Sequence, residues 1–257
     1  MKTAISIRNL SFSYGEGQVP LISCMNLDIH KGTVVAILGA NGVGKTTLLY
    51  ILLGLYPANT GEVCFFNKSK IGYGAGHIKQ LIGMVSQNES IPFDLSVEEY
   101  VLLGRAPHLN LFRIPGGEDK RAVKNALATV GVTHLAACGM TRLSSGEKQL
   151  VNVARALTHN PDILLLDEPC SHLDLINTRQ MLNLIKTIVR NGRTVVFSTH
   201  DPNAASAVAD QVILLKKGKL VANGSPEQTL TQELLTDTYG GPIEVLNTSR
   251  GPLVLAI

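Results

Sequence analysis

The sequence has few cysteines and no cysteine motif. Its four cysteines lie far apart along the 257 residues, with no C-x-x-C pair and no histidine cluster beside them. Metal ligation by cysteine is therefore not expected, and a reduced cytosolic setting fits the chain. The four are Cys24, Cys64, Cys138 and Cys170.

Segments that would carry the chain into or across a membrane are also missing. No run approaches the ~18 apolar residues that a membrane-spanning helix needs. Residues 1–17 contain no long apolar stretch, so no signal peptide is expected. The net charge of +3 is too small to indicate binding to nucleic acid or to an anionic membrane surface. Any membrane role is expected to act through a partner, and no nucleic-acid partner is expected.

The chain does contain short apolar runs that alternate with longer helical patterns. Runs such as "VVAIL" and "ILLL" are apolar throughout, which is typical of strands in a sheet covered on both faces. This alternation predicts an α/β fold with a mainly parallel sheet. The predicted strands are residues 4–8, 34–38, 63–66, 82–85, 163–166, 194–198 and 212–215; the predicted helices are residues 45–55, 96–104, 118–131, 146–158, 175–190 and 202–209.

The strand signal disappears between Gln87 and Asn160, where the sequence reads as helices and loops and includes the Pro/Gly-rich "RAPHLNLFRIPGG". We therefore predict a helical subdomain, residues 87–159, inserted into a core formed by residues 1–86 and 160–225. Residues 226–257 are predicted to form a short tail, with a helix started by a proline and a Gly-Gly-Pro break.

A glycine-rich loop lies between a predicted strand and a predicted helix. Gly39, Gly44, Lys45 and Thr46 match G-x-x-x-x-G-K-[ST]. Glycines let successive backbone N–H groups point at phosphate oxygens, and the helix start adds partial positive charge. Lys45 can reach the β- and γ-phosphates, and the Thr46 hydroxyl can ligate Mg²⁺. The alternative, an ordinary glycine turn before a helix, is disfavoured by this context.

The segment "ILLLDEP" supplies two carboxylates at the end of a predicted buried strand. Ligands of open α/β sheets bind at this carboxyl edge. Asp167 is predicted to hold the metal through water, and Glu168 to act as general base on the attacking water. The alternative is an ordinary acidic turn, which the presence of the glycine loop disfavours.

A second helix start, "LSSGEKQL", permits two interpretations. Ser144 and Glu147 form a capping-box pattern, so Ser144 can simply cap the helix that follows. A helix start with two serines and a glycine is also a ready anion site. Because it lies inside the predicted insertion, it is not expected to reach the glycine loop of its own chain. A second copy of the chain could present it, with ATP between the two copies.

Together these motifs resemble the nucleotide-binding subunit of an ABC transporter over essentially the whole chain. The glycine loop resembles the Walker A motif, "ILLLDEP" the Walker B motif and "LSSGE" the family signature. Further matches follow in the family's order: Tyr14 in "FSY" as the aromatic that stacks on adenine, Gln87 as the Q-loop, Asp174 in "SHLD" as the D-loop, and His200 in "STH" as the switch histidine. The resemblance implies one ABC ATPase domain over residues 1–257, with a P-loop ATPase core, an N-terminal antiparallel β portion and an inserted α-helical subdomain.

The resemblance also implies roles, with ATP and Mg²⁺ as cofactors. Gln87 would contact the metal or the water, and His200 would hold the γ-phosphate and orient the water. Asp174 would bridge two ATPase chains, and Ser144 and Gly146 would donate to the γ-phosphate bound by the opposite chain. At Ser145 the family usually has glycine, so this cross-chain contact is where the chain departs from the pattern. The nucleotide loop would comprise Gly39, Asn41, Gly42, Gly44, Lys45, Thr46 and Thr47.

The transported cargo is a separate inference. Two segments resemble ATPases of metal-chelate importers, which take up ferric siderophores, haem and cobalamin and have molybdate or tungstate relatives. The first is "GR-x-P-H" with the acidic helix start after it, and the second is the tail "GSPEQTLTQELLTDTYG". Implied partners are a second copy of the chain, two copies of a polytopic permease docked near Gln87 and residues 95–113, and an extracytoplasmic binding protein. The chain would then lie at the cytoplasmic face of the cell membrane.

Alternatives remain at this point. Another class of ABC importer or an exporter carries the same motifs, and a soluble non-transport ABC protein is a further possibility. A P-loop kinase or GTPase is disfavoured because "NKSK" lacks the aspartate of NKxD. A group of basic residues is either a solvated face or a docking surface: Arg105, Arg113, Lys120, Arg121 and Lys124.

Overall fold

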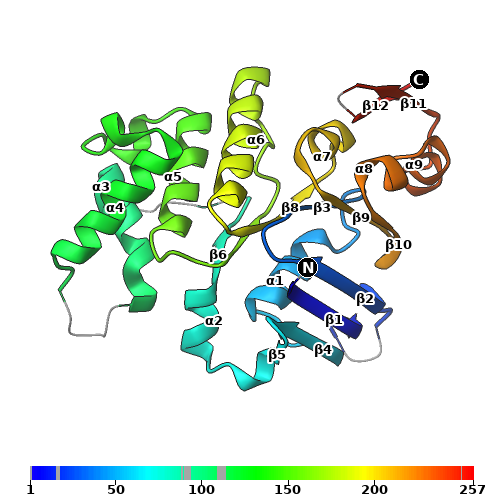
Figure 1. The fold of residues 1–257 in the computed structure, drawn as a ribbon, viewed down its shortest axis with the longest axis horizontal. Coiled ribbons are helices and arrows are strands. Elements are labelled where there is room, and N and C mark those ends of the chain that lie inside the picture. The colour runs from blue at the N-terminus through cyan, green and yellow to red at the C-terminus, as the bar shows by residue number, and fades with distance from the viewer. Residues whose placement is uncertain (1, 16–17, 88, 90–93, 109–113, 250) are drawn as a thin grey trace.

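The computed structural model describes residues 2–15, 18–87, 89, 94–108, 114–249 and 251–257. Figure 1 shows a central sheet, with the helices α3, α4 and α5 gathered on one side of the molecule and the tail on the other. The strands are β1 (Thr3–Phe12), β2 (Ile22–His30), β3 (Val34–Leu38), β4 (Thr60–Phe65), β5 (Lys68–Ser69), β6 (Ile82–Val85), β7 (Ile163–Leu166), β8 (Thr194–Thr199), β9 (Gln211–Lys216), β10 (Lys219–Gly224), β11 (Ile243–Thr248) and β12 (Gly251–Ala256). The helices are α1 (Lys45–Leu53), α2 (Ala75–Leu81), α3 (Val97–Leu102), α4 (Gly117–Val130), α5 (Ser145–Leu157), α6 (Leu175–Arg190), α7 (Pro202–Val208), α8 (Pro226–Thr229) and α9 (Gln232–Tyr239).

The predicted α/β fold with a mainly parallel sheet is confirmed. Within the described residues, the main sheet has the strand order β10-β9-β3-β8-β7-β6. Its neighbours from β9 to β6 pair in parallel, and β10 pairs with β9 in antiparallel fashion. Since parallel strands end at one edge, the carboxyl ends of β3, β7 and β8 lie side by side, which brings together residues far apart in the sequence.

Both faces of this sheet are covered, as its apolar strands predicted. On β3, Val35 and Ile37 pack into a core shared with α1 and the antiparallel strands, whereas Ala36 and Leu38 pack into a second core shared with α5 and α6. Alternate residues of one strand therefore serve two cores, which explains why "VVAIL" contains no polar residue.

The N-terminal antiparallel portion is also present, with the order β2-β1-β4-β5 among the residues described. Parts of β1 and β4 were predicted from the sequence, and β2 was not. In β2, buried residues alternate with exposed or partly exposed ones instead of forming a continuous apolar run. This pattern is typical of a strand with one face in the core.

Between β6 and β7 the described residues form helices and turns, apart from an isolated bridge between Ser96 and Gly139. Helices α3, α4 and α5 share a core that includes Val101, Leu127 and Val151. This helical content agrees with the predicted insertion, whose boundaries remain predictions. In the described part of the chain, no helix is both long and apolar enough to cross a membrane.

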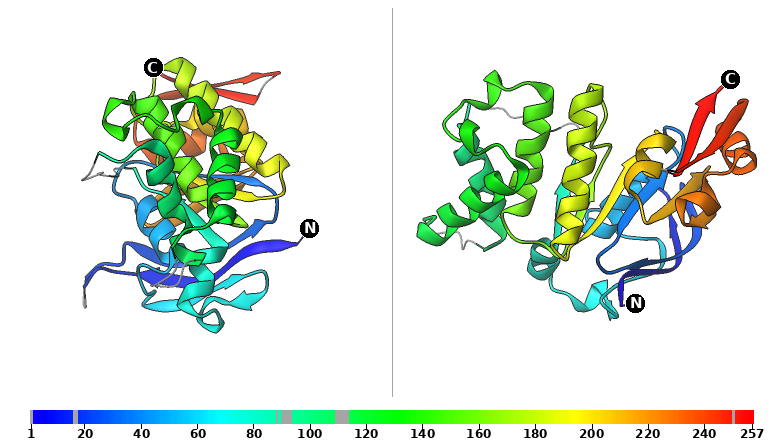
Figure 2. Two further views of the ribbon diagram at one scale, coloured as in Figure 1. Left: turned by 90° about the vertical axis from the view of Figure 1, so that its left-hand side faces the viewer. Right: turned by 45° about the horizontal axis from the view of Figure 1, so that its top comes forward.

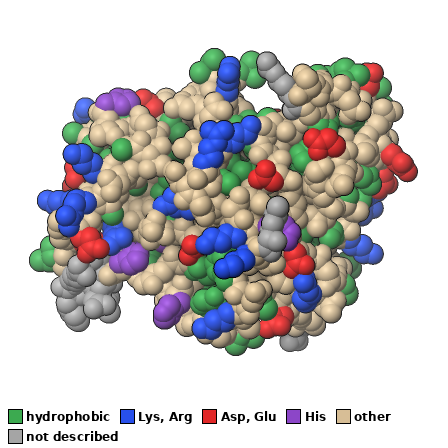
Figure 3. Space-filling view, viewed as in Figure 1, with side chains coloured by type: hydrophobic (Ala, Val, Ile, Leu, Met, Phe, Trp, Pro, Cys, Tyr) green, Lys and Arg blue, Asp and Glu red, His purple; other side chains and the backbone are tan. Residues whose placement is uncertain are grey.

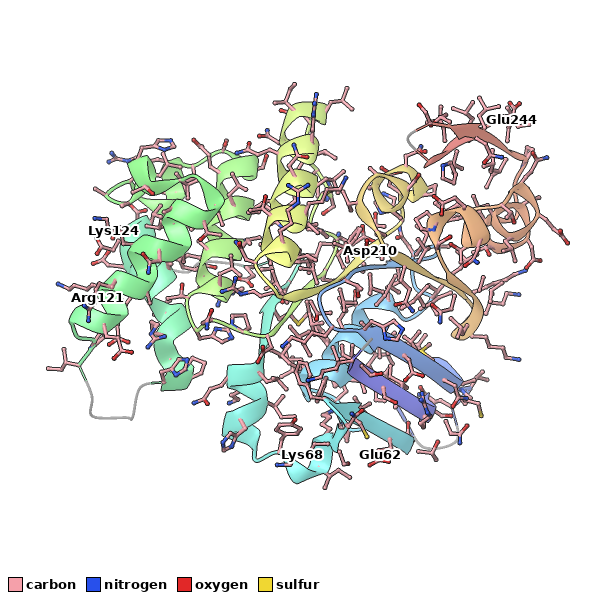
Figure 4. The ribbon with its side chains drawn as sticks, viewed as in Figure 1. Glu62, Lys68, Arg121, Lys124, Asp210 and Glu244 are labelled. Atoms are coloured by element: carbon pink, nitrogen blue, oxygen red, sulfur yellow. The ribbon has the colours of Figure 1, made fainter. Side chains whose placement is uncertain are left out.

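The prediction of a basic face needs correction at Arg105. This arginine is only 9% exposed, and its Nε lies 2.8 Å from Oδ1 of Asp119, which is 1% exposed. Arg105 also donates to the Thr158 carbonyl oxygen, so it joins three segments of the helical region and does not contribute to a surface. Arg121 and Lys124 do point outward from α4 (Figure 4), and Arg113 lies outside the described residues. On the face shown in Figure 3, basic and acidic side chains are interspersed.

We expect Asp119→Ala to lower the free energy of unfolding by about 3–5 kcal/mol, because Arg105 would remain buried without its carboxylate. Urea unfolding followed by circular dichroism measures this. The matched control is Arg8→Ala, which breaks the exposed pair between Arg8 and Asp28 and should cost less than about 1 kcal/mol. Equal effects of the two substitutions would contradict a stabilising role for the buried pair.

The tail contains more structure than predicted. Helix α8 begins at Pro226 as expected, and α9 ends at the Gly-Gly-Pro break. The residues that follow form a hairpin of β11 and β12, which the sequence analysis did not identify. Figure 2 shows this hairpin next to α7 and α9.

Candidate functional site

The glycine loop connects β3 to α1 and depends on glycine at specific points. Gly44 is the N-cap of α1 and has φ of 103°, a left-handed conformation that glycine adopts readily. A Cβ added to Gly39 would lie 2.5 Å from the Leu215 carbonyl oxygen, so the loop passes too close to β9 for any larger residue. The predicted loop is therefore present between the predicted strand and helix.

Lys45 lies inside this loop and is 6% exposed. Its Nζ donates to the carbonyl oxygens of Gly39, at 2.8 Å, and Ala40, at 3.3 Å. It also lies 3.3 Å from Oε1 of Glu168. The loop backbone thus holds one ammonium group beside the second carboxylate of "ILLLDEP".

The carboxylate of Asp167 lies just after the end of β7, next to the glycine loop, and accepts hydrogen bonds from two hydroxyls. Thr46 Oγ1 donates to Asp167 Oδ1 at 3.1 Å, and Ser198 Oγ donates to the same oxygen at 2.5 Å. The Ser198 Oγ also accepts from the backbone N–H of Glu168 at 2.8 Å. From the adjacent strand β8, Ser198 therefore orients the Asp167 carboxylate and holds the backbone of Glu168. This role of Ser198 was not predicted. The available signal was a serine within an apolar strand, two residues before His200.

Glu168 is 7% exposed and adopts φ of 49°, which is uncommon for a residue with a side chain. Its Oε2 lies 2.9 Å from Nδ1 of His200. A contact of this length with an ionised carboxylate requires the proton to be on Nδ1. Glu168 is thus bounded by Lys45 on one side and His200 on the other.

These groups open into a cleft with a volume of about 870 Å³. Tyr14 is 62% exposed, and its hydroxyl is hydrogen-bonded to the Thr47 hydroxyl at 2.9 Å. The Tyr14 ring packs edge-on against Phe12, which leaves part of the Tyr14 ring open to the cleft. Burial raises the pKa of the Cys170 thiol in the cleft to about 12, so this thiol stays protonated. The predicted residues that line the cleft are Tyr14, Asn41, Gly42, Gly44, Lys45, Thr46, Thr47, Gln87, Glu168 and His200.

Five predicted residues are not among those that line this cleft: Gly39, Asp167, Ser144, Gly146 and Asp174. Ser144 and Glu147 form the predicted capping box of α5: the Ser144 hydroxyl accepts from the Glu147 N–H, and Glu147 Oε2 accepts from the Ser144 N–H at 2.8 Å. Gly146 packs against Asn177, and Asp174 caps α6 by accepting from the Asn177 N–H at 2.8 Å. The capping interpretation is therefore confirmed, and the exposed Ser144 is accessible to a second molecule.

Gln87 is exposed at the edge of the cleft. Two residues later, Glu89 forms an ion pair with Arg155 of α5 at 2.6 Å and accepts from the Tyr100 hydroxyl at 2.7 Å. This network links the segment after Gln87 to the helix that begins at Ser145. It was not predicted, because an ion pair between residues so far apart in sequence leaves no local pattern.

The donor set beside the loop suits a hard cation. Thr46 and Asp167 offer a hydroxyl and a carboxylate, the oxygen ligands that Mg²⁺ takes in combination with substrate phosphates and water. The described residues contain no cluster of three or more His, Cys, Asp or Glu side chains that could hold a metal ion by themselves. A cation here would therefore depend on the phosphates for its remaining ligands.

Comparison with known proteins agrees with this geometry. A family model described as ABC transporter matches residues 22–171. The molybdate import ATP-binding protein of Haemophilus influenzae is 38% identical over 244 residues, covering 95% of this chain and 90% of that protein. The ferric enterobactin transport ATP-binding protein of Escherichia coli is 35% identical over 235 residues, covering 91% of this chain and 87% of that protein.

A solved structure of an inward-facing transporter assigned to the metal-chelate type also matches. Its chain has a TM-score of 0.87 and 34% identity, and the match covers 100% of this chain and 98% of that one. The relatives and the solved structure thus match nearly the whole length of the chain, and the family model matches more than half of it. The chain therefore belongs to the ABC transporter family, among its ATP-binding and ATP-hydrolysing subunits.

Proposed function

We propose that the chain powers an importer for a metal chelate, such as a ferric siderophore, haem or cobalamin, by hydrolysing ATP in the cleft between α1 and β8. The convergence of Lys45 and His200 on Glu168 most directly supports the ATP-hydrolysing part of this proposal. It places a buried cation, a carboxylate and an imidazole within hydrogen-bonding reach at the sheet edge where α/β folds bind ligands.

The proposed chemistry follows from these contacts. The Lys45 ammonium and the loop N–H groups bind the β- and γ-phosphates, and Tyr14 stacks on adenine. Thr46 and Asp167 would hold Mg²⁺, with Gln87 in contact, and the ion would supply positive charge against the phosphates. Glu168 accepts the proton of the attacking water, and His200 orients that water and the γ-phosphate.

We further propose that two chains act as a head-to-tail pair. Ser144 and Gly146 are not among the residues that line their own chain's cleft, and the start of α5 is a suitable donor site for a γ-phosphate bound by the partner. Asp174, exposed beside the cleft residues Leu173 and Leu175, would bridge the copies. Ser145, also exposed, would stand next to the partner's γ-phosphate.

The proposed cargo class rests on the relatives. The ferric enterobactin protein and the metal-chelate transporter support a chelate importer. The relative at 38% identity, named for molybdate import, supports molybdate as a second candidate. Both candidates require the same partners: two copies of a polytopic permease and an extracytoplasmic binding protein.

The chain would sit peripherally at the cytoplasmic face of the membrane, docked to the permease near Gln87 and residues 95–113. Of this region, Gln87 and Leu103 are exposed, and residues 109–113 lie outside the described part of the chain.

The test is to purify the chain with its permease and binding protein, and to assay ATP-driven uptake into vesicles. Metal analysis of the ligand that co-purifies with the binding protein should find iron or cobalt for a chelate. Molybdenum would select the second candidate. ATPase activity that no permease alters would contradict a transport role.

A further inference from the structure

The tail after β10 packs on the element that follows His200. Helix α7 begins two residues after His200, and its buried Ala204 and Ala205 share a core with Leu235 of α9 and Val254 of β12. Figures 1 and 2 show the β11–β12 hairpin beside α7. Residues more than thirty positions after His200 in the sequence therefore pack next to the helix that follows His200.

Side chains of α7 hold the outer edge of β12. The Asn203 carboxamide accepts from the Val254 N–H at 2.8 Å and donates to the Val254 carbonyl oxygen at 2.9 Å. This reciprocal pair replaces the two bonds that a neighbouring strand would make to one residue. Ser206, one turn further along α7, donates to the Pro252 carbonyl oxygen at 2.7 Å. The hairpin is therefore attached to α7 by directed hydrogen bonds as well as by apolar packing.

The same asparagine is attached to the residue after His200. Its backbone N–H donates to the capping carboxylate of Asp201 at 2.8 Å, and the Asp201 N–H donates to Thr199 Oγ1 at 3.0 Å. Asn203 thus bonds to the tail through its side chain and to the His200 turn through its backbone. A displacement of the hairpin would change the position of the backbone that carries the His200 imidazole.

Tyr239 at the end of α9 makes a second attachment, since its hydroxyl donates to the His200 carbonyl oxygen at 3.3 Å. Burial, and then the nearby Asp201 and Glu168 carboxylates, raise the pKa of Tyr239 above its ordinary value, so the hydroxyl remains a donor at neutral pH. The distance exceeds the ~2.8 Å typical of O–H···O bonds, and the Asn203 pair is the stronger attachment. An ion pair between Lys216 and Asp237 at 2.6 Å holds α9 on β9.

We propose that the β11–β12 hairpin is a positioning element of the hydrolytic step, and that Asn203 and Tyr239 act through His200 without touching the nucleotide. The inference rests on the proposed role of His200 towards Glu168. Neither Asn203 nor Tyr239 lines the nucleotide cleft, so loosening either attachment affects the placement of the imidazole and not the affinity for ATP.

The first test is steady-state kinetics of the intact chain. Asn203→Ala should lower kcat for ATP hydrolysis about ten-fold, because small misplacements of catalytic groups are costly. The KM for ATP should stay within about two-fold. Tyr239→Phe, which removes one oxygen, should lower kcat about three-fold in the same manner. The matched control is Tyr73→Phe, which removes a comparable bond from a tyrosine to the Phe65 carbonyl oxygen at 3.0 Å and should leave kcat unchanged.

The second test repeats these substitutions in a His200→Ala background. If the attachments act through His200, neither substitution lowers the residual kcat further. Equal losses in both backgrounds would indicate general destabilisation and overturn the inference. If His200→Ala lowers kcat and the two attachment variants do not, the inference alone fails. If His200→Ala leaves kcat unchanged, the proposed role of His200 fails first, and the inference falls with it.

A third readout does not depend on activity. The ¹⁵N imidazole resonances of His200, assigned by their loss in His200→Ala, should shift in Asn203→Ala and Tyr239→Phe and stay in place in Tyr73→Phe. Unchanged His200 resonances in both attachment variants would overturn the proposal even if kcat fell.

Discussion

Replacing Glu168 with glutamine is expected to reduce ATP turnover by about a thousand-fold, the scale of losing a general base. Glutamine keeps the size of the side chain and an oxygen that can accept from Lys45 or His200, whose nitrogens lie 3.3 and 2.9 Å from the carboxylate. It cannot accept a proton from water. Affinity for ATP should be preserved, because the loop that binds the phosphates is untouched.

Phosphate release measures the turnover of this variant, and calorimetry measures its ATP affinity. Glu62→Gln, at an exposed position on β4 (Figure 4), is the matched control and should behave as the unmodified chain does. Turnover of Glu168→Gln within a factor of about three of normal would remove Glu168 from the role of general base.

The same variant tests the proposed pairing of two chains. With hydrolysis stopped, two clefts should retain two ATP molecules between the exposed Ser144 turn of one copy and the loop of the other. Sedimentation should then detect a dimer that appears with ATP and dissociates when ATP is removed. If sedimentation detected only monomer at saturating ATP, both for the isolated chain and with the permease present, the head-to-tail arrangement would be contradicted.

Lys45→Ala is expected to cause the largest loss of nucleotide affinity. The ammonium is 6% exposed and is oriented by two loop carbonyls. Bonds from a charged group of this kind contribute about 2 kcal/mol or more, so Kd for ATP should rise at least about thirty-fold. The substitution also leaves the buried Glu168 without its closest cation, which adds a cost to the folded state.

Calorimetry with ATP and Mg²⁺ checks this result, and thermal unfolding separates weaker binding from loss of fold. Lys68→Ala is the control, since Lys68 lies on β5 over the Tyr73 ring and away from the cleft (Figure 4). An unchanged Kd in folded Lys45→Ala would contradict the assignment of the loop as a phosphate site.

The parts of the site that were predicted without the family resemblance are those encoded by contiguous residues; Tyr14, Gln87 and His200 were predicted only through that resemblance. Gly39 to Thr46 form a loop whose backbone conformation, lysine and hydroxyl are all local properties, and "ILLLDEP" ends a strand at the edge where ligands bind. The capping box at Ser144 is similarly local. Such features follow from turn chemistry and periodicity without knowledge of which strands are neighbours.

The parts that were missed depend on pairings between distant segments. Ser198 orients Asp167 only because β8 pairs with β7, and Arg155 meets Glu89 only because α5 packs on the segment after β6. Arg105 was expected at a surface because arginine is seldom buried without a partner, and its partner Asp119 is supplied by another helix. In each of these examples the position of the side chain depends on residues distant in the sequence, and the periodicity of the sequence does not reveal such neighbours.

The strand order has a consequence for how the protein is made. Strand β3 ends in the nucleotide loop and lies between β8 and β9, which are synthesised more than 150 residues later. A nascent chain therefore carries "VVAIL" with both hydrogen-bonding edges open until β8 and β9 have emerged. Such late, long-range closure is slow and leaves the intermediate prone to aggregation. The phosphate-binding loop is thus translated well before the two strands that support it.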